Sequence, residues 1–126
     1  MTIAEVSKAY EISSDTLRYY ERIGLIPAVN RTSGGIRNYT EEDLSWVKFA
    51  KCMRSAGLKV EALVEYVALF QQGDSTHEAR KRILLEQRSQ LMVRLKEMQE
   101  TLDRLNVKIE KYEQVVIPAE KRLKKA

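Results

Sequence analysis

Cysteine and histidine are scarce in this chain, and their scarcity excludes several classes of protein. Cys52 is the only cysteine among 126 residues, and one thiol cannot form a disulfide within the chain. This excludes a small secreted fold that depends on disulfides. His77 is the only histidine, and no paired nucleophile and base is visible in the sequence, so we do not expect an enzyme.

Long apolar runs are also absent. No run approaches the roughly 20 residues that cross a bilayer, and the opening Met-Thr-Ile-Ala-Glu lacks the basic and then apolar order of a signal peptide. We therefore expect a cytoplasmic protein with no membrane partner. With 22 Lys and Arg against 18 Asp and Glu, the net charge of +4 favours a polyanionic partner, although ribosomal and membrane-surface proteins share this balance.

Glycine and proline are few, with 5 and 2 residues, and they separate the predicted helices. Thr2 and Glu5 form a capping box that starts a first helix, and Ser13 or Ser14 caps a second helix that ends at Gly24. Two short helices joined by a tight polar turn indicate a helix-turn-helix.

The segment after the second helix predicts a wing and two more helices. Residues 25 to 39 place apolar and aromatic residues around a Ser-Gly-Gly turn, which predicts a short hairpin, here called the wing. Thr40 caps a third helix that ends before Gly57, and residues 60 to 70 repeat the helical spacing. We assign residues 1 to 73 to an N-terminal head with these linker helices.

The strongest periodic signal follows the head. A capping box at Ser75 and Glu78 precedes a stretch without glycine or proline, which predicts one helix over residues 75 to 117, about 60 Å long. Its apolar residues alternate in steps of three and four, and only Arg88 breaks the series. They are Leu84, Leu91, Leu95, Met98, Leu102, Leu105, Ile109, Tyr112 and Val116.

This apolar row predicts a homodimer that pairs through the long helix. A head of about 70 residues cannot cover the row along its full length, and no turn lets the helix fold back, so a second copy must cover it. Periodicity alone leaves the direction of the two helices open. Pro118 ends the row, and residues 118 to 126 form a basic tail that we expect to be solvated. The predicted fold is mainly α.

The residues of the head resemble those of a known family. The segment from Asp15 reads Asp-Thr-Leu-Arg-Tyr-Tyr-Glu, the next motif is Gly-Leu-Ile from Gly24, and the wing ends with Gly-Ile-Arg-Asn-Tyr. This order resembles the MerR family of bacterial transcription regulators over nearly the whole chain. The resemblance implies a winged helix-turn-helix whose second helix enters the major groove, and a long C-terminal dimerisation helix that forms an antiparallel coiled coil.

By this resemblance, DNA contacts come from the second helix and the wing. Arg18 can reach base edges or phosphates, and Tyr19 and Tyr20 differ by about 100° around the helix, so we expect only one of them to face DNA. Arg31 and Arg37 flank the turn, where phosphate contact suits two cations better than internal pairing. A solvated arginine and tyrosines in the core are the alternatives. The candidates are Thr16, Arg18, Tyr19, Tyr20, Arg31, Arg37 and Tyr39.

The family resemblance also implies how such a dimer acts. Members bind promoters whose two recognition elements are too far apart for RNA polymerase, and the ligand-activated dimer bends and untwists the spacer so that the elements align. Deformation energies of a few kcal/mol are within reach of a switching dimer. The implied partners are double-stranded promoter DNA and a second copy of the chain, with RNA polymerase involved indirectly.

Cys52 is the candidate sensor. Metal-sensing members carry cysteines near the start of the long helix and in a loop after it, where this chain has none, and an iron-sulfur cluster would need four cysteines. We therefore expect no metal and no cofactor. Cys52 and its neighbours resemble the branch that responds to aldehydes and other electrophiles through a thiol, whereas a small core residue is the alternative. A winged-helix protein with a metal or small-molecule effector, or without effector control, is the second hypothesis.

Overall fold

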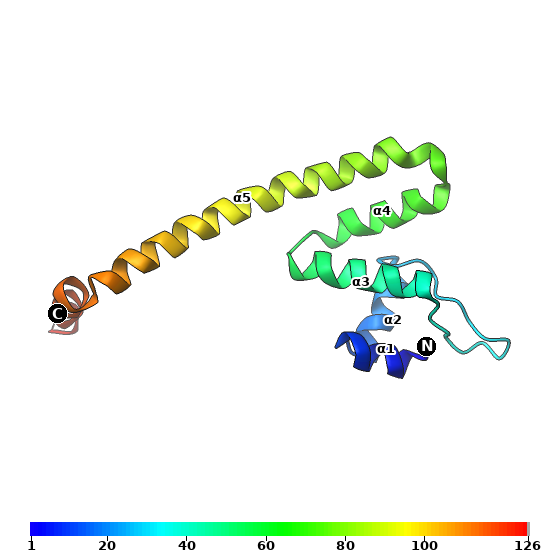
Figure 1. Ribbon diagram of the computed structural model, residues 1–126, viewed down its shortest axis with the longest axis horizontal. Helices are drawn as coiled ribbons and strands as arrows, with labels where there is room; N and C mark the ends of the chain where they lie inside the picture. Colours follow the sequence, from blue (N-terminus) through cyan, green and yellow to red (C-terminus); the bar gives the residue numbers. More distant parts are fainter. Residues whose placement is uncertain (126) are drawn as a thin grey trace. The chain divides into compact units, whose positions relative to one another are not determined.

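The computed structural model describes residues 1 to 125, so Ala126, the last residue of the predicted tail, lies outside the described residues. Figure 1 shows a chain of helices joined by short connections, apart from one longer loop. In order, the elements are α1 (Ile3–Tyr10), α2 (Ser14–Ile23), α3 (Glu41–Ser55), α4 (Val60–Gln72), a 3-10 turn (Asp74–Thr76), α5 (His77–Glu110), a π-helical turn (Tyr112–Val116) and α6 (Ile117–Lys125). The chain divides into two compact units, Met1–Leu91 and Met92–Ala126.

Local capping sets the helix-turn-helix. The Thr2 hydroxyl accepts a hydrogen bond from the Glu5 backbone N–H at 3.2 Å, and the Glu5 carboxylate accepts one from the Thr2 N–H at 2.9 Å. Ser13 caps α2 by accepting from the Thr16 N–H at 3.0 Å, and Gly24 ends that helix with φ of 80°. These caps satisfy N–H groups that a helix cannot pair internally, and they confirm the helix-turn-helix of the predicted fold.

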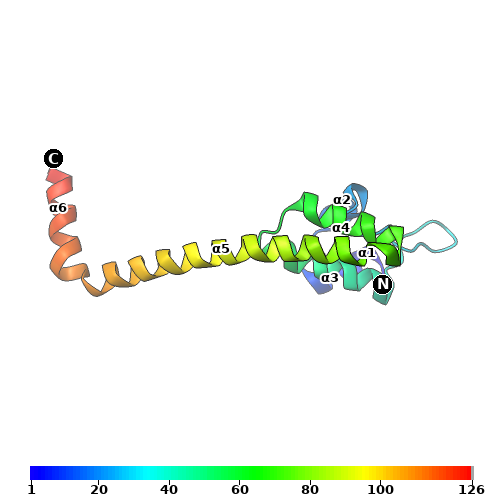
Figure 2. The same ribbon diagram turned by 90° about the horizontal axis from the view of Figure 1, so that it is seen from above.

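The wing is a hairpin-shaped loop and not a pair of strands. Arg31 and Arg37 form one isolated antiparallel bridge, and the Thr32 N–H donates to the Ile36 carbonyl at 2.8 Å. Gly35 supplies the turn with φ of 83°, a conformation that favours glycine. Figure 2 shows this loop projecting from the helices of the first unit. Side chains of α2 and α3 also hold this loop, since Glu21 accepts from the Val29 N–H at 2.9 Å and Asp43 accepts from the Asn30 N–H at 3.2 Å.

The core of the first unit joins α1, α2, the wing, α3 and α4. Leu17 of α2, Val47 of α3 and Leu63 of α4 are almost fully buried, and burying a side chain of this kind stabilises the fold by about 1.5–3 kcal/mol. The buried cluster consists of Val6, Ile12, Leu17, Leu25, Ile26, Val29, Tyr39, Val47, Ala50, Leu58 and Leu63. Apolar residues on the inward faces of the predicted helices therefore form the core.

The start of α5 differs from the predicted cap at Ser75. Gly73 has φ of 102°, and a 3-10 turn over Asp74–Thr76 leads directly into the helix. The hydroxyl of Thr76, which is 9% exposed, approaches the carbonyl oxygens of Leu69 and Gly73 at 2.7 and 2.8 Å. The Thr76 hydroxyl thus provides a hydrogen-bond donor for carbonyl groups at the end of α4, which have no partner within that helix.

The predicted apolar row serves two purposes along α5. Leu91 is partly buried against the core of the first unit, whereas Leu84 is 36% exposed. Beyond the first unit, the row from Leu95 to Tyr112 is exposed on the isolated chain. The row is therefore one exposed surface only after Leu91, since the first part of α5 turns a different face toward its own unit.

The second unit ends in a further helix, which corrects the predicted single helix to residue 117. Helix α5 ends at Glu110, and a π-helical turn over Tyr112–Val116 leads into α6. Val116 is 8% exposed, so its own unit covers it and it does not extend the open row. Pro118 lies in the first turn of α6, where a missing N–H costs nothing, so it starts a helix instead of a tail. The described basic side chains Lys121, Arg122 and Lys124 are exposed.

Candidate nucleic-acid interface and thiol site

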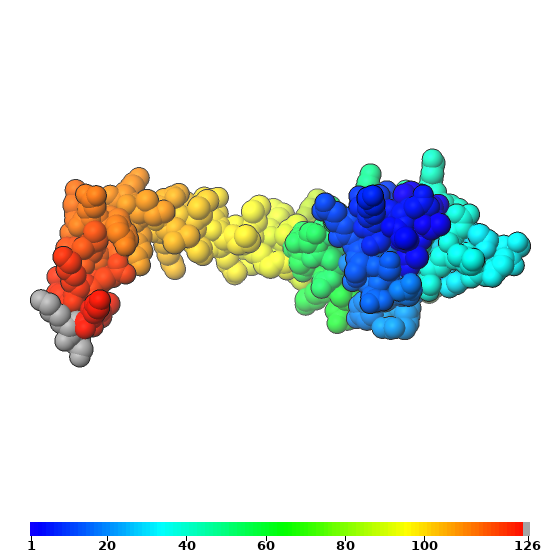
Figure 3. Space-filling model, turned by 90° about the horizontal axis from the view of Figure 1, so that it is seen from below, coloured from blue at the N-terminus to red at the C-terminus, as the bar shows by residue number. Residues whose placement is uncertain are grey.

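Helix α2 carries two of the predicted DNA-contacting residues on its exposed side. Arg18 is about half exposed and its guanidinium lies 3.0 Å from the carboxylate of Asp15, which is almost fully exposed. An ion pair this open contributes little to stability, so Arg18 can exchange it for a phosphate or a base edge. The Arg22 guanidinium lies 5.3 Å from the centre of the exposed Tyr19 ring. Figure 3 shows α1, α2 and the wing, coloured from dark blue to cyan, together on one face of the first unit.

The structure distinguishes the two adjacent tyrosines. Tyr19 is 44% exposed, whereas Tyr20 packs partly buried against the core. Of the two, Tyr19 is therefore the one whose ring is accessible to a partner. Thr16 is half-buried, and its hydroxyl accepts a hydrogen bond from the Ser13 hydroxyl at 2.8 Å as part of the α2 cap.

Tyr39 is a core residue, which corrects its assignment to the DNA contacts. Its side chain is 2% exposed, and burial raises the pKa of its hydroxyl. Within the described part of the chain this hydroxyl has no hydrogen-bond partner. The backbone of Tyr39 pairs with Met1: the Tyr39 N–H donates to the Met1 carbonyl at 2.8 Å, and the Met1 ammonium donates to the Tyr39 carbonyl at 2.8 Å. A ring held inside the core cannot reach the DNA surface.

The two wing arginines have different surroundings. Arg37 donates from Nε to the Glu21 carboxylate at 2.7 Å, and these side chains are 24% and 12% exposed. The expectation that it avoids internal pairing is therefore wrong, because the largely buried Glu21 carboxylate needs hydrogen-bond donors. Arg31 donates to the Gly35 carbonyl at 2.9 Å, and its side chain is exposed. Arg31 is therefore the more exposed of the two wing arginines.

Two carboxylates outside the predicted site residues, Glu21 and Asp43, hold the wing in place. Glu21 also accepts from the Val29 N–H at 2.9 Å, so it binds both arms of the wing to α2. Asp43, 6% exposed, accepts from the Asn30 side chain at 3.1 Å and from the Thr40 N–H at 3.0 Å. In the sequence, the position of Glu21 directly after Tyr19 and Tyr20 of the family motif was the feature that could have indicated its role.

The charge of Asp43 is stabilised by its surroundings. Burial by itself would raise the pKa of this carboxyl. Hydrogen bonds from the Thr40 backbone and from the side chain and backbone of Asn30 outweigh it, and they hold the pKa below its ordinary value. The ionised form of Asp43 is therefore the one that orders the wing.

Cys52 lies near the end of α3 with an exposed side chain. The core alternative for this residue therefore does not hold in the described chain. Its backbone carbonyl accepts from the Ala56 N–H at 3.2 Å, which places it at the start of the connection to α4. Beside it, the Lys51 ammonium donates to the Tyr10 carbonyl of α1. The thiol is thus accessible to a reagent and lies next to a residue that contacts the helix-turn-helix.

His77 is not part of a metal-binding cluster. Among the residues that the structure describes, no group of three or more His, Cys, Asp and Glu side chains could hold a metal ion. One ring nitrogen lies 3.7 Å from the Asp74 carboxylate, and the other lies 3.0 Å from a nitrogen of the Arg80 guanidinium. A cation at the ring opposes metal binding there. Within the same described residues, no helix is long and apolar enough to cross a membrane.

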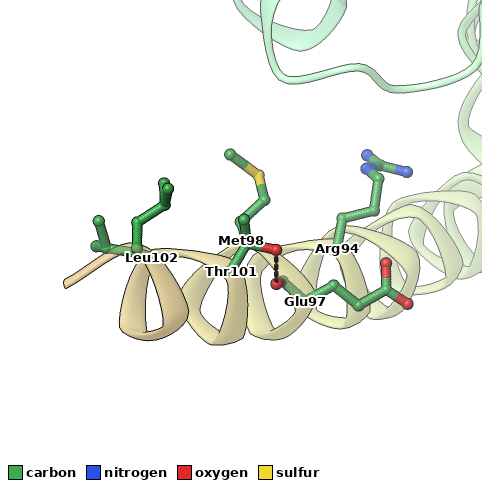
Figure 4. A pocket seen from close by; sticks show the side chains of 6 residues that line it. Arg94, Glu97, Met98, Thr101 and Leu102 are labelled. Carbon is green, nitrogen blue, oxygen red and sulfur yellow. Dashed lines mark hydrogen bonds between the residues drawn. The ribbon is translucent and has the colours of Figure 1, made fainter. Parts of the chain in front are cut away.

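The second part of α5 presents an open apolar groove. Figure 4 shows Met98 and Leu102 pointing to the same side of the helix, with Arg94 at one end of the groove. Leu105 continues the lining. Leu95, Met98, Leu102, Leu105, Ile109 and Tyr112 are all exposed. The predicted dimer row is thus accessible on this stretch, while Leu91 and Val116 are occupied within the chain.

A helix-turn-helix with an exposed second helix and an adjacent wing defines a winged helix-turn-helix DNA-binding protein. Residues 1–69 match the MerR HTH family regulatory protein model, and residues 44–107 match the model described as MerR, DNA binding. The chain therefore belongs to the MerR family of transcriptional regulators. This confirms the resemblance seen in the sequence and agrees with the expectation of a regulator in place of an enzyme.

Individual relatives agree with this placement. The chain is 56% identical over 92 residues to the HTH-type transcriptional regulator AdhR of Bacillus subtilis, covering 73% of this chain and 66% of that protein. It is 35% identical over 108 residues to the transcriptional regulator ZntR of Escherichia coli, covering 82% and 77%. The first match thus spans slightly less than two thirds of the relative's length.

Solved structures show the same fold. A crystal structure of a MerR family transcriptional regulator from Listeria monocytogenes matches with a TM-score of 0.88 and 49% identity, over 99% of this chain and 95% of that one. HiNmlR, a MerR family regulator lacking the sensor domain and bound to promoter DNA, matches with a TM-score of 0.82 and 28% identity, over 92% of each chain. Both comparisons extend well beyond the helix-turn-helix.

Proposed function

We propose that the chain is a cytoplasmic homodimer that binds double-stranded promoter DNA in the spacer, activates transcription by distorting it, and senses aldehydes or related electrophiles through Cys52. The observation that carries the sensing role is an exposed thiol, the chain's single cysteine, at the end of α3. The similarity to AdhR supports the same assignment. RNA polymerase takes part indirectly, through the altered shape of the promoter.

DNA binding in this proposal uses the exposed side of α2 and the tip of the wing. Arg18 and Tyr19 face outward from α2, and Arg31 stands on the wing. Glu21 and Asp43 keep the wing fixed relative to α2 and α3, so these contacts form without first ordering a loop. The solved complex of HiNmlR with promoter DNA supports DNA as the partner.

Dimerisation in this proposal uses the exposed row of α5. Six large apolar residues follow a regular helical spacing from Leu95 to Tyr112 and stay exposed on one chain. A contiguous apolar surface of this kind on a soluble protein marks an interaction site, and a second copy offers the same row. Two joined heads bind two half-sites far more tightly than one head binds one.

The proposed sensing reaction is an addition to a carbonyl group. The Cys52 thiolate sulfur attacks the carbonyl carbon, an S–C bond forms, and the C=O π electrons move to oxygen, which takes a proton from water. The product is a hemithioacetal, and no oxidant or reductant is consumed. Lysine amines are almost wholly protonated at neutral pH, with an ordinary pKa of about 10.4, so the thiol is the better nucleophile.

The test compares Cys52→Ser with wild type after treatment with formaldehyde or methylglyoxal. We expect the variant to fold and to bind operator DNA like wild type, yet to give no rise in transcription in vitro, while mass spectrometry finds the adduct on Cys52 of the wild type. The control adds Ser55→Cys to Cys52→Ser, which moves an exposed thiol by less than one helical turn. We expect an adduct there without a transcriptional response. Full induction of Cys52→Ser would disprove the sensing role and favour a regulator with another effector or none.

A further inference from the structure

A glutamine lies buried on α5 where its neighbours are apolar. Within α5, all of which the structure describes, Gln87 is the one buried residue, at 5% exposure. Ile83 and Leu91, four residues before and after it, lie on the same face and are partly buried. A buried amide costs free energy unless it forms hydrogen bonds. Gln87 meets this requirement by accepting from the Lys59 backbone N–H at 3.3 Å.

Helix α4 has no local side-chain cap at its N-terminus, and Gln87 of α5 takes that place. Among α1 to α4, all within the described part of the chain, α4 alone has no side-chain hydrogen bond at its N-cap, Lys59. In α1 and α3 the third helical residue, Glu5 or Asp43, binds the N-cap N–H. The corresponding residue of α4 is Ala62, which has no acceptor. Gln87 supplies from α5 the bond that a capping box normally makes locally.

The same N–H lies at the end of a bonded connection that begins at Cys52. The Ala56 N–H donates to the Cys52 carbonyl at 3.2 Å, and the Leu58 N–H donates to the Met53 carbonyl at 3.0 Å. The Arg54 guanidinium donates to the Leu58 carbonyl at 2.6 Å, and Leu58 is buried. The segment from Cys52 to Lys59 is therefore a compact turn that internal hydrogen bonds hold together.

We infer that Gln87 is the positioning residue that couples this turn to α5, so that an adduct on Cys52 changes how α5 is held. The inference rests on the proposed sensing role of Cys52. The bond to Lys59 fixes the register of α5 against the turn. A single buried polar contact on an otherwise apolar face of the helix is satisfied in one alignment only. An adduct that shifts the turn breaks this bond, and α5 then settles in another position. Packed elements switch between discrete arrangements in this way.

The experiment uses the full chain and removes the bond from either side. Gln87→Met removes the acceptor at nearly constant size, and Lys59→Pro removes the donor at a residue whose φ of −69° suits proline. Gln90→Met makes the same change on the next turn and serves as the control. In Gln87→Met we expect the Lys59 amide to exchange with solvent about 2- to 10-fold faster, the range for one lost hydrogen bond.

The decisive readout is the bend of operator DNA, measured by energy transfer between dyes at its ends, before and after formaldehyde. We expect Gln87→Met and Lys59→Pro to form the Cys52 adduct to the same extent as wild type by mass spectrometry, but to lose most of the change in bend. Gln90→Met and the acceptor-retaining Gln87→Glu should keep it.

The possible failures are distinct. If Gln87→Met and Lys59→Pro both keep the change in DNA bend seen in wild type, the inference is overturned and the sensing role stays intact. A wild type that forms the adduct without any change in bend would overturn the sensing role and the inference together. If Gln90→Met loses the change in bend as fully as Gln87→Met does, any substitution on this face of α5 has the same effect. That result would also overturn the specific role of Gln87.

Discussion

At the scale of single residues, the wing is ordered by carboxylates and not by strand pairing. Glu21 binds both arms to α2, and Asp43 binds Asn30 and Thr40 at the base. Charge-assisted hydrogen bonds of this kind are stronger than neutral ones. Arg37, which the sequence indicates as a DNA-binding cation, is therefore part of this support, whereas Arg31 is the exposed cation of the wing.

The two arginines should consequently respond differently to substitution. Arg31→Ala removes an exposed cation from each head of the proposed dimer, so we expect the slope of log affinity for operator DNA against log salt concentration to become shallower by about 2, with unchanged stability. Arg37→Ala leaves Glu21 with one partner fewer, so we expect lower thermal stability as well as weaker binding. Fluorescence anisotropy over a salt series and thermal unfolding measure both. Equal effects of the two variants on stability would contradict the assignment.

Asp43 should make stability depend on acid. Its pKa is lower in the folded chain than in the unfolded one, so the carboxylate contributes stability that is complete above the unfolded value of about 3.9 and is lost as pH falls through the folded value. Asp43→Asn should therefore be less stable by about 1–3 kcal/mol at pH 7, and the difference from wild type should shrink below about pH 4. Urea unfolding at several pH values measures it. The exposed Asp15→Asn serves as the control, and a difference that grew with acid would refute the prediction.

At the scale of elements, most helix boundaries follow from the local sequence. Caps at Thr2, Ser13 and Thr40 and the ends at Gly24 and Gly57 depend on neighbouring residues, so a single sequence is enough to predict them. Tyr39 was not predictable in this way, because its burial depends on residues far away in the chain. The same holds for Gln87, whose partner is 28 residues distant.

Helix α2 offers a direct test of such a local signal. Gly24 ends the helix at φ of 80°, where an added Cβ would meet only Val64 Cγ1 at 3.8 Å, an ordinary contact. Gly24→Ala should therefore cost about 1–2 kcal/mol of unfolding free energy through backbone strain alone. Gly34→Ala, at a residue without positive φ and with Thr32 Oγ1 at 3.8 Å, should be close to neutral. Denaturant unfolding of both compares them, and equal stabilities would remove strain as the explanation.

At the scale of the whole molecule, the exposed row on α5 should control assembly. Leu102→Glu combined with Leu105→Glu places charges where a second copy would pack, so we expect a monomer and a loss of most operator affinity. Sedimentation should give about twice the chain mass of 14.6 kDa for wild type. Val93→Glu, at an exposed residue outside the row, is the control and should remain dimeric. A double variant that stays dimeric with full affinity would contradict the proposed interface.

Helix α5 changes its burial pattern near Leu91, and this has a thermodynamic consequence. Substitutions at Ile83, Gln87 or Leu91 act on contacts inside one chain, so they should lower the melting midpoint relative to wild type by a similar amount at every protein concentration. Substitutions at Leu95 or Met98 act on the proposed dimer contact, so their effect on the midpoint should disappear on dilution, where wild type is also monomeric. Comparing each variant with wild type at two concentrations would therefore locate, residue by residue, where the helix stops stabilising its own chain and starts to depend on mass action.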